Sequence, residues 1–182
     1  MKSKGKAEWI GQGYKIVAQN GFNSLSIEVL SRIVGKNKSS FYHYFGNLEM
    51  FRKALLEHHI TSTQQFANAA AKCANLKPEV LNLMIELKDD LFFHKQLRIN
   101  RTEAAYKACF ERSYDLFQKA IFDKWANYLG LSQQTFLAAT ILNLASENFL
   151  LRITYDSFSY EWLESYLSEF SNMMKNINNS SS

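Results

Sequence analysis

Two short helical patterns on either side of a glycine, in residues 24–53, constrain the fold of this chain more than any other segment. The first pattern follows Ser26, whose hydroxyl can cap a helix, and its apolar residues recur at helical spacing: Ile27, Val29, Leu30, Ile33 and Val34. Gly35 is expected to end this helix, because glycine reaches positive φ without steric cost. In the second pattern, Lys38–Phe45, two phenylalanines four residues apart can anchor one face of a helix. The segment therefore predicts a helix-turn-helix, followed by a further helix that starts near Asn47.

The remaining side chains of the second helix carry an ammonium group, hydroxyls, an imidazole and phenols. Such a face suits a groove that is lined by phosphates and base edges, and it would form a poor core. We expect the groove-facing set to be Lys38, Ser39, Ser40 and His43. Tyr42 and Tyr44 are expected to contact phosphates, although either can instead pack against the first helix. The predicted DNA-binding residues are completed by Ser26, Lys36, Lys6 and Lys53, with Lys2 and Lys4 adding positive charge.

The positive charge of the chain is concentrated in the same region. Residues 1–60 contain nine Lys and Arg against four Asp and Glu, whereas the remainder contains twelve against thirteen. The excess behind the formal net charge of +4 therefore lies with the helix-turn-helix. This asymmetry favours a polyanionic partner at the N-terminal end of the chain.

Residues 21–53 resemble the DNA-binding domain of the TetR family of bacterial transcriptional regulators. The similarity rests on the Gly35 turn and on three short runs, Gly21-Phe22, Phe41-Tyr42-His43-Tyr44-Phe45 and Asn47-Leu48-Glu49. The resemblance implies an all-α fold, with an N-terminal three-helix helix-turn-helix domain and a C-terminal helical domain for ligand binding and dimerisation. It also implies a ligand-responsive repressor that binds a palindromic operator in double-stranded DNA as a homodimer. The effector would reorient the long fourth helix and so change the spacing of the two recognition helices.

The rest of the chain is predicted to be helical, because its apolar residues follow the helical period and its 182 residues include one proline, Pro78. We assign residues 1–46 to the helix-turn-helix domain, 47–177 to the ligand-binding and dimerisation domain, and 178–182 to a disordered tail. The expected helices cover about 6–20, Asn47 to before Asn75, Pro78 to a bend near Asn100, Thr102 to Leu129, Gln133 to Tyr155 with Ser132 as its cap, and Tyr160 to Ile177.

The two C-terminal helices are apolar over wide faces and need partners. An intrachain core satisfies them, and so does a four-helix bundle made by two copies of the pair. The family resemblance favours the bundle, because two recognition helices related by a two-fold axis read a palindromic site. The predicted dimer interface consists of Leu137, Ile141, Leu144, Asn148, Leu151, Leu163, Tyr166, Leu167, Phe170 and Met174.

Aromatic residues are frequent along the middle helices, where the family encloses a ligand cavity. At helical spacing such residues most often form plain core, and the alternative is that some of them line a pocket. The predicted ligand-binding set is Phe66, Phe92, His94, Tyr106, Phe110, Tyr114, Phe117 and Trp125, for an apolar or aromatic small-molecule effector. His94, Arg98 and Arg101 are candidates for binding an anionic group of that effector.

Other chemistries find little support in the residues. His58 and His59 are adjacent on a helix and so diverge by about 100°, which disfavours a shared metal ion. There is no G-x-S-x-G elbow and no P-loop, so we expect neither an enzyme nor a cofactor. Cys73 and Cys109 form no pattern, which indicates free thiols in a reducing compartment. With no signal peptide and no long apolar run, we expect a cytoplasmic protein that does not enter a membrane.

A second hypothesis is a helical small-molecule sensor of the same fold that no longer reads DNA. The family usually has a small aliphatic residue after the turn glycine, where this chain has Lys36. It also commonly has a lysine just before the Glu49 position, where this chain has Leu48. Charge reversal at Lys38 separates the two hypotheses, because it would abolish DNA affinity only under the first.

Overall fold

The computed structural model describes the backbone of residues 2–180 and the side chains of residues 5–176. Within that part of the chain every regular element is helical, which confirms the predicted all-α class. The helices are α1 (Lys2–Asn20), α2 (Ile27–Val34), α3 (Lys38–Phe45), α4 (Leu48–Ala70), α5 (Leu81–Glu86), α6 (Lys88–Ile99), α7 (Ala104–Leu129), α8 (Thr135–Arg152) and α9 (Tyr160–Ser180), with short turns η1 (Phe22–Ser24) and η2 (Leu76–Val80).

The chain divides into two compact units, and their boundaries cut through α4 and α7. Unit 1 comprises residues 1–63 and 89–114, and unit 2 comprises residues 64–88 and 115–182. This division differs from the predicted boundary after residue 46. Most of α4, all but the first residue of α6 and the first part of α7 pack with the helix-turn-helix.

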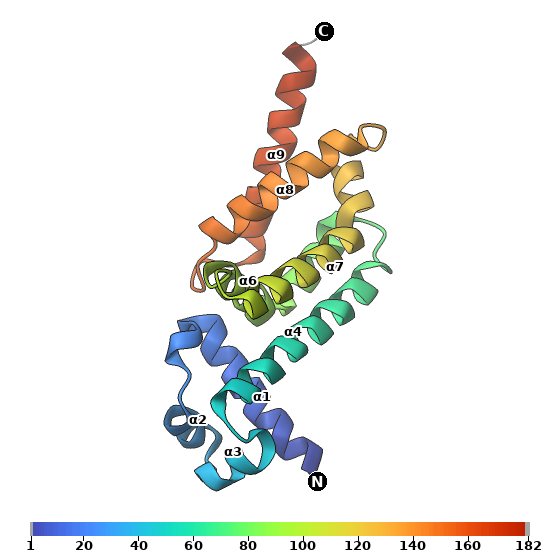
Figure 1. Ribbon diagram of the computed structural model, residues 1–182. Coiled ribbons are helices and arrows are strands. Elements are labelled where there is room, and N and C mark those ends of the chain that lie inside the picture. The colour runs from blue at the N-terminus through green and yellow to red at the C-terminus, as the bar shows by residue number, and fades with distance from the viewer. Residues whose placement is uncertain (1, 181–182) are drawn as a thin grey trace. The chain divides into compact units, whose positions relative to one another are not determined.

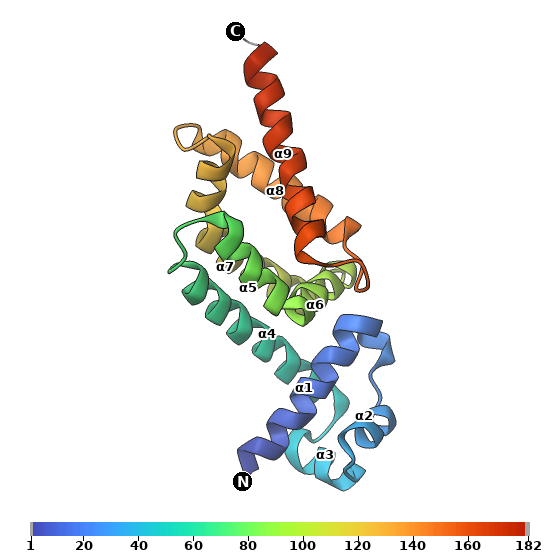
Figure 2. The same cartoon turned by 180° about the vertical axis from the view of Figure 1, so that it is seen from behind.

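In unit 1, α2 and α3 lie beside α1, as both views of the chain show (Figures 1 and 2). The centre of this group is aromatic. Trp9 of α1 and Phe51 of α4 are fully buried, and Phe41 of α3 meets both rings edge-on, at centroid distances of 5.4 and 5.2 Å. Such edge-to-face pairs stabilise a core beyond their buried area. These contacts fix the position of α3 against α1 and α4.

In unit 2, α8 and α9 cross each other at an angle and form the C-terminal helix pair (Figures 1 and 2). The hydroxyl of Tyr166 in α9 donates a hydrogen bond of 2.6 Å to the carbonyl of Ala145 in α8, and both residues are buried. Trp125 of α7 donates its indole N–H to the carbonyl of Ala138 in α8, at 3.1 Å. These buried bonds fix which side of α8 faces inward.

Three predictions about helix ends were wrong. The helix expected from Pro78 to near Asn100 is interrupted at Leu87 (φ −99°, ψ 33°), and α6 starts at the next residue with two aspartates in its first turn, a charge that favours a helix N-terminus. Ser132 does not cap α8, because its hydroxyl donates to Asn127, and α8 begins at Thr135. The tail predicted to be disordered is helical through Ser180, while residues 181–182 lie outside the described part.

Candidate nucleic-acid interface

The turn between α2 and α3 is built by local backbone and side-chain chemistry. Ser26 accepts a hydrogen bond of 3.2 Å from the N–H of Val29 and so caps α2, as predicted. Gly35 ends α2 in the left-handed conformation (φ 67°, ψ 28°), and both it and Lys36 donate their N–H groups to the carbonyl of Ser31. A side chain other than glycine would be strained at this φ. The sharp turn that separates the two helices therefore depends on Gly35.

Both ends of α3 are also fixed locally. The side chain of Asn37 caps its start by accepting a bond of 2.9 Å from the N–H of Ser40. At its end, Gly46 donates its N–H to the carbonyl of Tyr42, and Asn47 immediately caps α4 through the N–H of Met50 at 2.8 Å. The cap at Asn37 was missed in the sequence, although asparagine directly before a helical pattern is the usual signal.

The apolar side of α3 is buried and the polar side is exposed. Phe41 is 0% exposed and Phe45 is 6% exposed, and both rings contact Phe51 of α4 at centroid distances of 5.2 and 4.8 Å. This confirms the predicted anchors. Four side chains that were expected to face outward are exposed on the opposite side of the helix: Lys38, Ser39, Tyr42 and His43. Ser40 is half-buried beside the Asn37 cap.

Tyr44 departs from the prediction that it contacts phosphates, because it packs against α1. Its hydroxyl oxygen lies 2.5 Å from where a methyl group on Gly5 would be, and the side chain is half-buried. The alternative role foreseen for the two tyrosines thus applies to Tyr44. Tyr42, which is 51% exposed, remains accessible to a partner.

The lysines around the turn form ion pairs with surface carboxylates. Lys38 pairs with Glu28 of α2, and Lys36 pairs with Glu8 of α1. The hydrogen bond from Lys38 lowers the pKa of the Glu28 carboxyl, and the same bond raises the pKa of Lys38. Lys53 pairs with Glu49 one turn earlier, at 3.0 Å. All three pairs lie at the surface, where an ion pair contributes little stabilising free energy. A phosphate can therefore compete for the ammonium groups.

Two further predicted DNA-binding residues are placed as follows. Lys6 is exposed and its ammonium lies over the Phe45 ring, 5.7 Å from the centroid. Ser26 is half-buried and uses its oxygen for the cap of α2, which leaves its O–H free to donate. The side chains of Lys2 and Lys4 lie outside the described residues.

The predicted ligand-binding residues are divided between the two units. Phe92, His94, Tyr106, Phe110 and Tyr114 belong to unit 1, and Phe66, Phe117 and Trp125 belong to unit 2. Several of them stack on each other or on the core: His94 on Phe110 at 4.5 Å, Tyr106 on Phe22 at 4.3 Å, and Phe66 on Phe117 at 5.3 Å between centroids. Burial lowers the pKa of His94 to about 3, so its imidazole is neutral at pH 7 and is a poor ligand for an anionic group.

The predicted dimer interface is partly inside the protomer. Five of its residues are buried within the chain and cannot form an outer surface: Ile141, Leu163, Tyr166, Leu167 and Met174. Phe170 is half-buried with its ring against Trp125 and Tyr166. By contrast, a stripe of α8 is exposed, made of Leu137, Leu144, Asn148 and Leu151, with Phe136 at its start. We call these five residues the α8 stripe.

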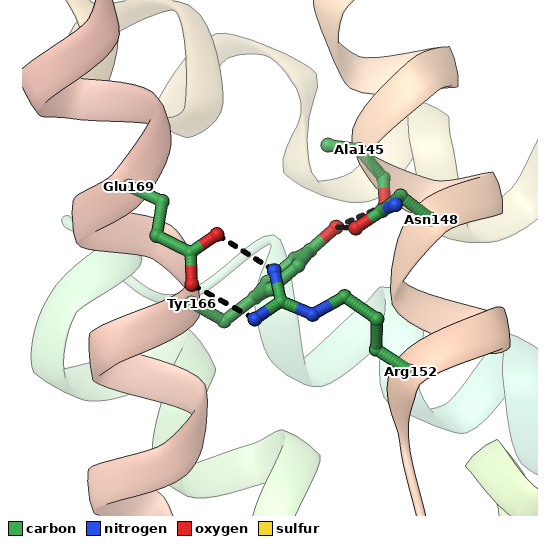
Figure 3. Close-up of polar contacts among 5 residues, drawn as sticks. All are labelled: Ala145, Asn148, Arg152, Tyr166 and Glu169. Atoms are coloured by element: carbon green, nitrogen blue, oxygen red, sulfur yellow. Dashed lines mark hydrogen bonds and ion pairs between the residues drawn. The ribbon is translucent and has the colours of Figure 1, made fainter.

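A polar cluster borders the α8 stripe at its C-terminal end (Figure 3). The Arg152 guanidinium makes two hydrogen bonds to the Glu169 carboxylate, of 2.6 and 2.9 Å, and lies 5.1 Å from the centroid of the Tyr166 ring. The Tyr166 hydroxyl, whose pKa is raised by burial, also lies 3.3 Å from the Asn148 side chain. This bidentate pair ties the exposed side of α8 to α9.

No group of three or more metal-binding side chains gathers among the described residues. His58 is exposed and His59 is buried, which matches the expected divergence of adjacent helical residues. Across the described helices, none has the length together with the apolar character that crossing a bilayer requires. The sequence matches no protein-family model, and no curated protein is significantly similar to it.

Proposed function

We propose that this protein is a DNA-binding transcriptional regulator of the TetR type, acting as a ligand-responsive repressor. The observation that carries the proposal is the two-sided character of α3. Its phenylalanines are buried against α1 and α4, while Lys38, Ser39, Tyr42 and His43 are exposed on the opposite side after a glycine turn. An α-helix with its side chains is about 10–12 Å in diameter, which fits the DNA major groove, about 12 Å wide.

The chemistry of the exposed set suits both kinds of contact that DNA offers. Ser39 and His43 can exchange hydrogen bonds with base edges, and Lys38 can neutralise a phosphate. The buried aromatic contacts of Phe41 and Phe45 give α3 a fixed orientation, so these groups are presented without ordering a loop on binding. The charge of the surrounding unit supports the same partner, because unit 1 contains fourteen Lys and Arg against eight Asp and Glu.

The proposal includes a homodimer, in which the α8 stripe of one protomer packs against that of a second copy. Leu144 is 65% exposed and Phe136 is 86% exposed, and large apolar side chains exposed on one helix can mark an interaction site. One α3 reads too few base pairs for high specificity, and two related by a two-fold axis read a palindromic operator. The effector, an apolar or aromatic small molecule, would act by binding two conformations of the protein with different affinity.

The experiment is selection of a binding site from randomised DNA duplexes with the full chain, followed by affinity measurements on the selected duplex across a salt series. We expect enrichment of a palindromic sequence and an affinity that falls steeply with salt concentration, because each neutralised phosphate releases counterions. Weak binding to every duplex, with no enriched sequence, would contradict the proposal.

A second candidate is a helical small-molecule sensor that does not bind DNA, and one observation favours it. Lys36 and Lys38 are both paired with acidic side chains, which reduces the free positive charge beside α3. Lys38→Glu distinguishes the two candidates. It should abolish affinity for the selected duplex if the protein is a regulator. If the protein is the sensor, the wild type and this variant should bind DNA equally weakly and without sequence preference.

A further inference from the structure

A chain of polar side chains crosses the aromatic core of unit 1 and connects four of its helices. The Tyr14 hydroxyl of α1 lies 2.9 Å from a carboxylate oxygen of Asp90 in α6 and 2.6 Å from Nδ1 of His59 in α4. His59 Nε2 lies 3.4 Å from Nδ1 of His94 in α6, and that same nitrogen lies 3.1 Å from Oγ of Ser113 in α7. His59 and Ser113 are the buried polar residues of the described side chains.

The groups at the two ends of this chain, Asp90 and Ser113, determine which atom donates the proton in each of its hydrogen bonds. A carboxylate only accepts, so the single Tyr14 proton goes to Asp90 and the Tyr14 oxygen must accept from Nδ1–H of His59. Nε2 of neutral His59 then carries no proton and accepts from Nδ1–H of His94.

The hydrogen bonds of Ser113 independently indicate the same His94 tautomer. Its hydroxyl proton is directed to backbone carbonyls of its own helix, with the Cys109 carbonyl at 2.8 Å, so its oxygen accepts from His94. Both histidines are therefore neutral Nδ1–H tautomers, and the protons all point from His94 toward Asp90.

Aromatic rings cover the middle of the chain, while Asp90 and His94 are half-buried. Phe93 of α6 stacks on Tyr14 at 4.2 Å and lies 5.0 Å from His59, and Phe110 of α7 stacks on His94 at 4.5 Å between centroids. The other titratable groups that face the chain are His58 on α4, edge-on to Tyr14 at 4.9 Å, Asp89 on α6 and Cys109 on α7. His59 is 2% exposed, so a proton added there would be buried without a free acceptor.

We infer that this one-way hydrogen-bond chain is a latch that fixes α1 to α4 and α6, and that it opens on acidification. A proton added at Nε2 of His59 would face the Nδ1–H of His94, which places two donors against each other at 3.4 Å. Accepting the proton therefore requires His59 and His94, and with them α4 and α6, to move apart. Tyr14 can then no longer bond both His59 and Asp90, so α1 loses its link to the other helices. The inference concerns the integrity of unit 1 and holds whatever molecule α3 binds.

The direction of the pH dependence follows from the pKa values in the two states. Burial, with the nearby His94 and His58, lowers the pKa of His59 well below its ordinary value, and burial lowers that of His94 to about 3. In the opened state both return to about 6.5. Above about pH 6.5 the latch contributes its full stabilising free energy. Between about pH 6.5 and 3 the opened state binds protons that the closed state excludes, so this free energy decreases as the pH falls. The opening constant should rise about tenfold per pH unit for each histidine.

Backbone hydrogen exchange of the full-length chain, followed by mass spectrometry at pH 7.5 and 5.5 and corrected for intrinsic rates, tests this inference. We expect the opening constant of α1 to rise between about tenfold and 100-fold at pH 5.5, while α9, in a unit without histidine, serves as the internal reference. In the His94→Gln variant, this rise of the opening constant should be smaller by a factor of about ten. The matched variant His58→Gln should keep most of the rise, because the exposed His58 makes none of the hydrogen bonds of the chain. Equal opening of α1 at the two pH values would overturn the inference.

Tyr14→Phe tests the connection to α1 directly, since it keeps the stack on Phe93 and removes the hydroxyl. At pH 7.5 it should raise the opening constant of α1 about tenfold, whereas Tyr106→Phe, a buried tyrosine of the same unit outside the chain, should not. Histidine 15N NMR of the wild-type protein provides a readout that needs no variant. It should report the Nδ1–H tautomer for both His59 and His94, and an Nε2–H tautomer at His59 would reverse the chain and refute the latch.

Discussion

At the scale of single residues, two glycines in α1 that look equivalent in the sequence have opposite roles. A methyl group at Gly13 would overlap the Phe51 ring, which is fully buried, whereas nothing lies within 4 Å of one at Gly11. Alanine gains up to about 1 kcal/mol of helix propensity over glycine at either position. At Gly13 overpacking costs about 1–3 kcal/mol.

We therefore predict that Gly11→Ala stabilises the protein and Gly13→Ala destabilises it, as measured by urea unfolding of the two variants side by side. A stabilising Gly13→Ala would show that the packing of α1 on α4 is looser than described.

Also at the residue scale, the Lys38–Glu28 pair holds the lysine that we propose for a DNA phosphate. Glu28→Gln frees Lys38 and removes a negative charge from the face of unit 1, so it should raise affinity for the selected duplex about twofold to fivefold. Lys38→Gln should lower the affinity and reduce the salt slope by about one. Fluorescence anisotropy across a salt series measures both. Glu161→Gln, an exposed acid at the start of α9 in unit 2, is the control and should change neither.

At the scale of elements, α3 is a two-turn helix that depends on its cap and on its neighbours. Isolated helices of this length are unstable in water, so the Asn37 cap and the buried phenylalanines supply its stability.

Asn37→Ala should cost about 1 kcal/mol of stability, and Asn37→Asp should retain most of it, because a carboxylate also caps. Urea unfolding of unit 1, followed through hydrogen exchange of α1 and α3, gives the comparison. Equal stability of Asn37→Ala and the wild type would mean that the cap contributes nothing to α3.

At the scale of the whole molecule, charge and apolar surface are distributed differently between the two units. Unit 1 has six more basic than acidic residues, fourteen against eight, and unit 2 has two more acidic than basic, nine against seven. The exposed apolar side chains of α8 belong to unit 2. We therefore assign the nucleic acid to unit 1 and the second copy of the chain to unit 2 within the proposed function.

Leu144→Glu places a charge in the middle of the α8 stripe, where the side chain is exposed and the fold of the protomer does not require it. Analytical ultracentrifugation should detect a dimer for the wild type and a monomer for this variant, with DNA affinity falling because one recognition helix is lost per complex. Ser165→Glu, an exposed change on α9, is the matched control and should remain dimeric. A wild-type protein that sediments as a monomer would refute the dimer.

The sequence by itself determined the all-α class, the two helices around Gly35 and the anchoring of α3 by Phe41 and Phe45. These features follow from caps, glycine conformation and helical period, which act within a few residues of the chain. Only the tertiary structure decided the inward packing of Tyr44, the burial of half the predicted dimer residues and the buried link from Tyr14 to His59 and Asp90. Such outcomes depend on which helices meet, and residues 45 and 76 positions apart give no local signal of contact.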